Sequence, residues 1–517
     1  MKEWLNQVVQ ICVTEMALEQ KRELIQKKQQ EFEQFDEKIQ NMIRELFRTG
    51  FDARDSVYIL SVFVTCAPEF IWEEELMQCI LREKNYTYAE NIMMEYQVKY
   101  FQLGKYGERK TLRKKSVDKL KQMGLYSEDY IPLSCRNQNR VVIITEQLLN
   151  IRHSPTLVVY NNIYYLRHLG YEVMVFVCPC DAYLQEGIWY HYRCATASEE
   201  LHGRTVVDTF KGEEIYYYQI NLCGEDCVDR YYAMIEWIRQ WNPLFVYEIG
   251  LLNAIGDTLA GMTTVVSEML SIKDCSVSNA QIIVRMEENE REIENEINEN
   301  LECCQTQLWV KEDMPICIVM PERQLTRKQL DLPEDKFLIA VVGNRLDLEC
   351  GTEFVALLKR MLQNNPMIGI VIIGETKNLN THFSENDNIY FIGYQEYLQN
   401  VYDILDLYLN PVRAGGGYSS QMAMQAGLPV VTMPGGDVAY MTGEDFIVTD
   451  YEEMYATVEK YVQDEVFRRE QRERARQRGM KNSKDTRYME RKIHAIKEII
   501  RLQENGKRCS RYTMSEG

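Results

Sequence analysis

The N-terminal part of the chain has the pattern of amphipathic helices. No proline or glycine occurs between Met16 and Gly50, and a glycine is a natural residue just beyond a helix end. The apolar residues of this stretch recur every three or four positions: Phe32, Phe35, Ile39, Met42, Ile43 and Leu46. That spacing places them on one helix face. With further helical patterns around 55–65, 73–82 and 86–102, the sequence predicts an all-α domain over residues 1–130.

A different pattern begins near residue 138, where short β-branched runs alternate with helical segments. A first set of strands is expected at 141–145, 171–177, 215–220, 244–249 and 263–268, with helices at 156–170 and 229–241. A second set follows residue 320, with strands expected at 337–344, 368–374, 388–393, 405–411 and 428–433. Strand–helix alternation indicates parallel βαβ units. The sequence therefore predicts two doubly wound α/β domains, with a ligand cleft at the carboxyl ends of their strands.

Two charged segments interrupt this pattern. Residues 285–302 are rich in glutamate, but Ile293, Ile297 and Leu301 lie four apart and predict one helix with an acidic outer face. Residues 105–122 are rich in lysine and arginine, which is typical of a solvated helix face or a linker. The alternative is a contact surface for an acidic partner or an anionic lipid, and hence a peripheral membrane contact through 105–122.

The composition excludes several classes of protein. At roughly 100–200 residues per domain, 517 residues make two or three domains. The 59 basic and 78 acidic residues give a formal net charge of −19, which argues against a nucleic-acid partner. No apolar run reaches the roughly 18 residues of a membrane span, and the polar N-terminus does not resemble a signal peptide. We therefore expect a cytoplasmic protein.

The potential metal ligands show no motif spacing. The 15 cysteines are scattered, and their close pairs lack the CxxC spacing of a zinc or redox site. The six histidines form no HExxH or HxxxH pair. We therefore predict no metal site.

A glycine-rich turn carries the most informative candidate chemistry. Gly415, Gly416 and Gly417 follow a predicted strand and open a predicted helix that continues through Tyr418, Ser419 and Ser420. Glycines permit tight turns and a close approach of the backbone to a ligand. Free N–H groups at a helix start favour a phosphate, and the serine hydroxyls would add donors. The alternative is a tight strand–helix turn that binds nothing.

A second turn follows the strand expected at 337–344. It contains Gly343, Asn344 and Arg345. An arginine at the carboxyl end of a strand can neutralise a diphosphate through a bidentate contact. The alternative is a surface ion pair between Arg345 and Asp347 or Glu349.

Together these segments resemble a known family. The two turns, in order with NIYFIGYQEYL at 388–398 and VYDILDLYLNP at 401–411, are similar to the donor-binding domain of GT-B glycosyltransferases of group 1. The resemblance is clear over 335–465 and weaker back to Val141, and GGGYSSQMAMQAGLPVVT is its most specific part. It implies two Rossmann-like doubly wound domains that face a cleft, preceded by the all-α domain. The expected domains are 1–130, 131–320 for the acceptor, 321–480 for the donor, and a C-terminal helix and tail at 481–517.

The resemblance also implies roles for individual residues. A nucleotide sugar would be the co-substrate, with no other cofactor. Arg345, in the turn with Gly343 and Asn344, would contact the donor diphosphate, and the segment from Gly415 to Ser420 would wrap the distal phosphate and the sugar. Tyr394 would contact the nucleotide base. Charge neutralisation by Arg345 and the helix start would make the reaction independent of a metal ion.

The sequence departs from the family at three positions. Retaining members carry two glutamates eight positions apart around the glycine turn, and these positions here are Ala414 and Met422. The basic residue usual in the first turn is replaced by Cys350. Gln421 is a substitute for the missing ribose contact, but on a helix it points about 100° away from Met422. A retaining or inverting outcome therefore stays open.

The acceptor side offers candidates for a catalytic base. The loop after the first strand of this domain holds Glu146 and His153, and Glu248 at the end of a later strand is a weaker candidate. The acceptor would be a protein, a glycan or a lipid-linked glycan. Two other functions stay open: a catalytically silent GT-B subunit that binds a polypeptide or a partner glycosyltransferase, and a sugar-nucleotide epimerase of the same fold.

Overall fold

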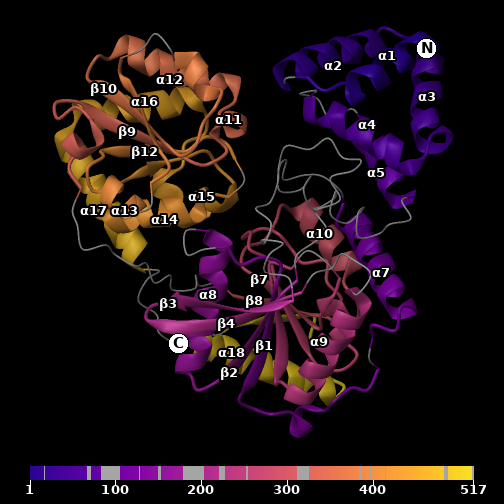
Figure 1. Cartoon of the computed structure of the whole chain (residues 1–517). Coiled ribbons are helices and arrows are strands. Elements are labelled where there is room, and N and C mark those ends of the chain that lie inside the picture. The colour runs from indigo at the N-terminus through magenta and orange to yellow at the C-terminus, as the bar shows by residue number, and fades with distance from the viewer. Residues whose placement is uncertain are drawn as a thin grey trace.

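The protein consists of three lobes (Figure 1). The computed structural model describes residues 1–16, 18–66, 72–82, 105–126, 128–149, 153–178, 203–220, 227–251, 254–310, 325–383, 387–395, 397–413, 415–481 and 487–514. The predicted helix at 86–102 lies outside these ranges, as does Ala414. Among the described residues, no helix has both the length and the apolar character needed to span a membrane.

The first lobe is helical, as predicted. It contains α1 (Lys2–Val13), α2 (Leu18–Glu33), α3 (Glu37–Glu45), α4 (Ala53–Cys66) and α5 (Glu73–Arg82). The run between Met16 and Gly50 is not one helix, because the Asp36 side chain accepts the N–H of Ile39 and starts α3. Trp72 is buried at the centre of this lobe, with its ring 4.4 Å from that of Phe32.

The second lobe is built on a nine-stranded sheet with the order β14-β8-β7-β6-β5-β1-β2-β4-β3. Its strands are β1 (Arg140–Thr145), β2 (Glu172–Val177), β3 (Arg204–Phe210), β4 (Glu213–Gln219), β5 (Phe245–Ile249), β6 (Val265–Glu268), β7 (Ile282–Arg285), β8 (Thr306–Trp309) and β14 (Arg511–Thr513). Five of them were predicted. The β3–β4 pair is antiparallel, unlike the parallel pairing expected, because Lys211 and Gly212 both take the left-handed backbone conformation of a tight hairpin turn.

Helices cover both faces of this sheet. One face packs against α8 (Ser154–His168) and α18 (Tyr488–Glu504), and the other against α9 (Cys227–Trp241) and α10 (Arg291–Asn300). Helix α18 comes from the end of the chain and returns to the second lobe (Figure 1). The segment after α18 also joins the second lobe, because β14 pairs with β8 through Tyr512 and Leu308.

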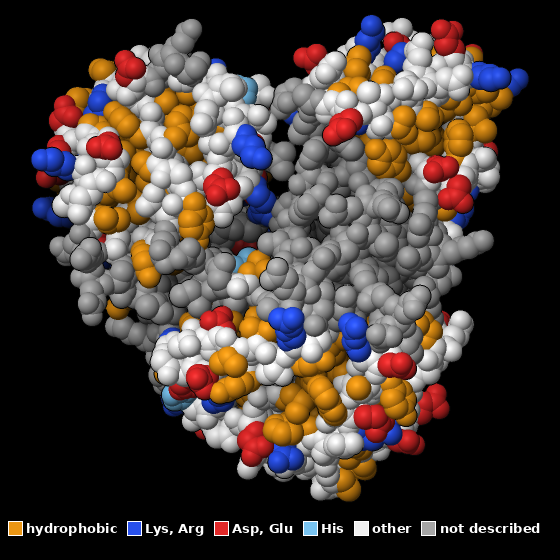
Figure 2. Space-filling model, in the orientation of Figure 1, with side chains coloured by type: hydrophobic (Ala, Val, Ile, Leu, Met, Phe, Trp, Pro, Cys, Tyr) orange, Lys and Arg blue, Asp and Glu red, His pale blue; other side chains and the backbone are white. Residues whose placement is uncertain are grey.

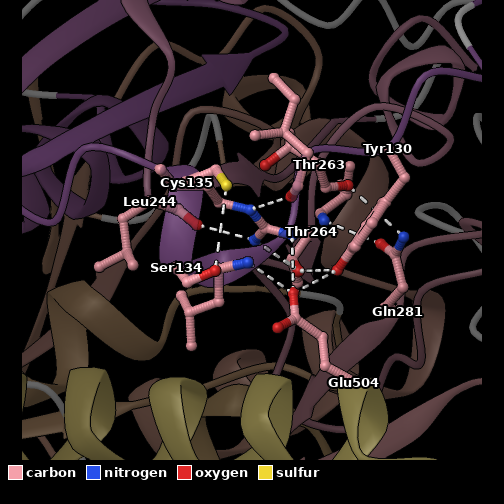
Figure 3. A network of polar contacts seen from close by, with 12 residues as sticks. Tyr130, Ser134, Cys135, Leu244, Thr263, Thr264, Gln281 and Glu504 are labelled. Atoms are coloured by element: carbon pink, nitrogen blue, oxygen red, sulfur yellow. Dashed lines mark hydrogen bonds and ion pairs between the residues drawn. The ribbon is translucent and has the colours of Figure 1, made fainter.

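A polar network fixes the end of α18 (Figure 3). The buried guanidinium of Arg136 donates to the Leu244 carbonyl at 3.0 Å and to the Thr264 hydroxyl at 2.9 Å. The same side chain pairs with Glu504 of α18 at 3.5 Å, and Glu504 also accepts the Leu133 N–H at 2.7 Å. The C-terminal helix is thereby part of the second lobe.

The third lobe carries a five-stranded parallel sheet with the order β11-β10-β9-β12-β13. Its strands are β9 (Phe337–Val342), β10 (Ile368–Ile373), β11 (Ile389–Gly393), β12 (Leu407–Leu409) and β13 (Val430–Val431). Its helices are α11 (Leu346–Glu349), α12 (Thr352–Asn364), α13 (Leu398–Tyr402), α14 (Gly417–Ala426), α15 (Gly436–Thr442), α16 (Tyr451–Gln463) and α17 (Glu465–Lys481). The core of one face includes α12 and α16, and that of the other includes α13, α14 and α17. This is the doubly wound domain that the second strand set predicts.

The basic segment 105–122 forms α7 (Tyr106–Gln122), which packs on the second lobe. Its Arg109 pairs with Asp274 at 3.1 Å, Lys110 donates to the Ser278 carbonyl at 2.8 Å, and Arg113 lies 3.6 Å from Asp257. These three side chains are buried. The expected solvated face is therefore wrong for them, because acidic and carbonyl groups of the second lobe lie opposite. The membrane contact stays a prediction for the exposed lysines of α7.

We expect Arg113→Ala to lower the free energy of unfolding by about 3–5 kcal/mol, because it leaves the buried Asp257 carboxylate without its cation. Urea unfolding followed by tryptophan fluorescence measures this change. Lys114→Ala, at an exposed position of the same helix, is the control and should change the free energy by less than about 0.5 kcal/mol. Equal effects of the two substitutions would contradict the buried pairing.

Candidate functional site

Two glycine turns meet at the carboxyl edge of the five-stranded sheet. Gly343, Asn344 and Arg345 directly follow β9, and the Gly343 N–H donates to the Ile373 carbonyl at the end of β10 at 2.9 Å. Gly374, with φ 130°, lies so close that a Cβ atom there would be 2.0 Å from the Gly343 carbonyl oxygen. The backbone of the first turn is thereby held in place by its neighbour.

The second turn begins α14. Gly415 and Gly416 have φ values of 77° and 85°, in the left-handed region that favours glycine. The N–H groups of the first turn of a helix have no acceptor within the helix. The Ser419 and Ser420 hydroxyls donate to the carbonyls of Gly416 and Gly417 at 2.8 and 2.7 Å. They are engaged within their own turn, so the donors that this turn offers are backbone N–H groups.

A carboxylate joins the two turns. Glu349 contacts Arg345 at 2.8 Å through one oxygen and Arg413 at 3.0 Å through the other. Of the two alternative partners of Arg345 that the sequence suggested, Glu349 is therefore the one that pairs. Asp347 instead accepts the backbone N–H groups of residues 377–379.

Arg413 is a site residue that the sequence reasoning missed. Its side chain is 4% exposed. It donates to Asn410 at 2.9 Å and to the Tyr408 hydroxyl at 2.7 Å, in addition to Glu349. The only signal in the sequence was its place just before the glycine run.

The start of α14 also faces the second lobe. The Tyr418 hydroxyl is buried, and its pKa is raised by burial and by the nearby Glu268 of β6 and Tyr165 of α8. In the adjacent α15, the Asp437 carboxylate accepts the Ile272 N–H at 3.2 Å and lies 3.4 Å from the Ser271 hydroxyl. The glycine turn therefore lies where the two Rossmann-like lobes meet. On the face drawn in Figure 2, Lys and Arg side chains lie on the edge of the third lobe toward the centre of the molecule.

Two polar side chains of α14 are buried without partners. Within the part of the chain that the structure describes, neither the Tyr418 hydroxyl nor the Gln421 amide has a hydrogen-bond partner. Buried polar groups are rarely left this way in native proteins. By contrast, Met422 packs against the apolar core of the third lobe. These positions offer polar contacts close to the glycine turn, although the family's glutamate is missing.

Tyr394 directly follows β11 and is 42% exposed. It therefore stands at the same carboxyl edge as the two glycine turns. Its predicted contact with a nucleotide base needs such an accessible ring.

On the acceptor side, Glu146 follows β1 and His153 precedes α8. The His153 Nδ1 atom lies 3.0 Å from the Thr156 hydroxyl, and burial lowers the pKa of His153 to about 4. The imidazole is therefore neutral at pH 7. Glu248 is different, since it is 1% exposed and a Cβ atom on Gly256 would be 1.8 Å from its carboxylate. Its pKa is raised to about 8 by burial and by Asp257, and this buried position does not suit an acceptor base.

Comparisons with known proteins agree with this architecture. Residues 322–480 match the family model of glycosyl transferases group 1. A mutant of O-GlcNAc transferase from Thermobaculum terrenum has a similar structure, with a TM-score of 0.52 and 12% identity over 98% of each chain. A glycosyltransferase from Rickettsia africae has a TM-score of 0.50 and 10% identity over 70% of this chain and 99% of its own. No curated protein sequence matches the chain.

The matched domain and the two facing Rossmann-like lobes define the fold class. Residues 322–480 form a domain of the glycosyl transferases group 1 family, and the chain as a whole has the fold of GT-B glycosyltransferases. In the described ranges, no group of three or more His, Cys, Asp or Glu side chains is placed to hold a metal ion.

We expect Gly374→Ala to lower the free energy of unfolding by about 3 kcal/mol, because the new Cβ atom would meet the Gly343 backbone and strain its own backbone. Thermal or urea unfolding measures the change. Gly351→Ala is the control, since a Cβ atom there meets nothing within 4 Å, and should cost at most about 1 kcal/mol. A tolerated Gly374→Ala would contradict the close packing of the two turns.

Proposed function

We propose that the protein transfers a sugar from a nucleotide-sugar donor to a protein, glycan or lipid-linked glycan acceptor. The observation that carries the proposal is the convergence of Arg345 and the first turn of α14 at the carboxyl edge of the group 1 domain. A cation and a helix N-terminus together favour a diphosphate. The leaving nucleoside diphosphate would gain negative charge in the transition state, where these groups stabilise it.

The remaining donor contacts follow from the same edge. Gly343 and Asn344 would border the diphosphate, and the segment from Gly415 to Ser420 would surround the distal phosphate and sugar. The Ser420 N–H donates to the Gly416 carbonyl at 3.1 Å, so the free N–H groups of this segment precede Ser420. Tyr394 would stack on the base. The Tyr418 hydroxyl and the Gln421 amide are polar groups still to be satisfied close by. Because Arg345 and the helix start supply positive charge, the proposal needs no metal ion.

The acceptor would bind to the second lobe. Glu146 and His153 are the candidate bases, and the neutral His153 imidazole is in the form that can accept a proton. One structural neighbour, which covers 98% of this chain, is named an O-GlcNAc transferase. UDP-N-acetylglucosamine is therefore a reasonable first donor to test, among other UDP- and GDP-sugars.

A second candidate function is a catalytically silent GT-B subunit that binds a polypeptide or a partner glycosyltransferase. The apolar Met422, which is partly buried against the core at the position where retaining relatives carry a glutamate, favours it. Co-purification with an active transferase, together with full function of Arg345→Ala in that complex, would support this alternative.

We expect purified protein to hydrolyse at least one UDP- or GDP-sugar slowly in the absence of an acceptor. Arg345→Ala should lower kcat/KM by about 100-fold or more, because it removes a cation from the developing charge. The control is Arg360→Ala, which removes an exposed arginine paired with Glu452 in the same lobe. If no nucleotide sugar is bound or turned over by the wild-type protein, the proposed function is wrong.

The pH dependence distinguishes the two candidate bases. If His153 is the base, its pKa of about 4 keeps it neutral as the pH falls from 7 to 5. Transfer should then lose activity through this group only near pH 4, and His153→Asn should abolish transfer while donor binding persists. Unchanged transfer by His153→Asn, with loss of transfer in Glu146→Gln, would assign the role to Glu146 instead.

A further inference from the structure

Glu349 is held between two arginines that come from different loops. Arg345 precedes α11 and contacts one carboxylate oxygen through both Nε and Nη2, each at 2.8 Å. Arg413 follows β12 and contacts the other oxygen through Nη1 at 3.0 Å. The carboxylate is 11% exposed, so these contacts are largely shielded from solvent. The three side chains together carry one net positive charge.

Arg413 is fixed on every side of its guanidinium. Nε donates to Asn410, Nη1 to Glu349 and Nη2 to Tyr408. Burial lowers the pKa of Arg413, but Tyr408 and Glu349 raise it by more, so the side chain stays charged. With these contacts and 4% exposure, Arg413 is placed to hold other groups and not to reach a ligand itself.

Both glycine turns pack on this guanidinium. A Cβ atom on Gly343 would lie 2.5 Å from Nη1 of Arg413, and one on Gly416 would lie 2.6 Å from Nη2. A Cβ atom on Gly415 would lie 3.5 Å from Nη2 of Arg345. The backbone of each turn and the positions of the two arginines are therefore coupled through direct packing.

We propose that Arg413 and Glu349 are positioning residues of the donor site. Arg413 fixes the Glu349 carboxylate, and Glu349 in turn fixes the Arg345 guanidinium beside the glycine turn that begins α14. This assignment rests on the proposed function, because it gives Arg345 a donor diphosphate to contact.

The test uses substitutions that keep each charge but change its reach. The shorter side chain in Glu349→Asp cannot bridge both arginines. Arg413→Lys loses the guanidinium that donates to Asn410, Glu349 and Tyr408 at once. We expect each to weaken the binding of UDP or GDP, measured by isothermal titration calorimetry, by about tenfold to hundredfold. The same changes made in an Arg345→Lys background should have much smaller effects, because they act through Arg345. Glu452→Asp is the matched control on an exposed ion pair of the same lobe.

The outcomes separate the two proposals. Wild-type affinity in Glu349→Asp and Arg413→Lys, alongside weakened binding by Arg345→Lys, would overturn the positioning roles and leave the proposed function standing. Losses that are just as large in the Arg345→Lys background would also overturn them, because the effect would not run through Arg345. If the wild-type protein binds neither nucleotide and turns over no nucleotide sugar, the proposed function fails and the positioning roles fail with it.

Discussion

The pairing of Glu349 with Arg345 and Arg413 is the interaction on which the candidate site depends. The carboxylate ties the turn after β9 to the segment after β12, and the glycines of both turns pack on the Arg413 guanidinium. A net positive site therefore exists in a chain with a formal charge of −19. Because a buried ion pair is costly unless its geometry is good, the hydrogen bonds from Arg413 to Tyr408 and Asn410 are part of the same arrangement.

The second lobe is assembled from segments far apart in the sequence. Helix α7 docks through buried cations on acidic and carbonyl groups, and α18 with β14 returns from the end of the chain to cover one face of the sheet. From the third lobe, Asp437 of α15 accepts the backbone N–H of Ile272 in the second lobe. Both substrates of a transferase need such a fixed relation between the two lobes, since the reacting groups must meet within hydrogen-bond distance.

Local patterns predicted much of the fold. The runs that form β1, β9 and β10 are dominated by apolar residues, so their burial is evident from the sequence. The short strand β14 has no apolar run and forms only because β8 offers a free edge. The hairpin strand β3 lies at the edge of the sheet, and its sequence RTVVDTF is neither a continuous apolar run nor a strict alternation, so its signal is weaker.

The sequence predicts the glycine turns of the candidate site. It does not predict the buried Arg413 side chain on which these turns pack. Glycine spacing identifies the turn before α14 because positive φ values leave a mark in the sequence. Arg413 leaves no signal beyond its place before the glycine run, since its partner Glu349 lies far away in the chain. The same reason explains the wrong expectation for α7. Its basic side chains were expected to be solvated because their partners, Asp257 and Asp274, are distant in the sequence. Long-range pairing of charges is what a single sequence does not reveal.

We infer that a diphosphate binds against the first turn of α14. Hydrogen–deuterium exchange with and without UDP or GDP tests it directly, because bound phosphate oxygens would accept the N–H groups of this turn. We predict slower exchange across residues 415–419, and the same protection should be lost in Arg345→Ala. Binding that leaves the exchange of these amides unchanged, or that protects only another part of the molecule, would contradict diphosphate binding at α14.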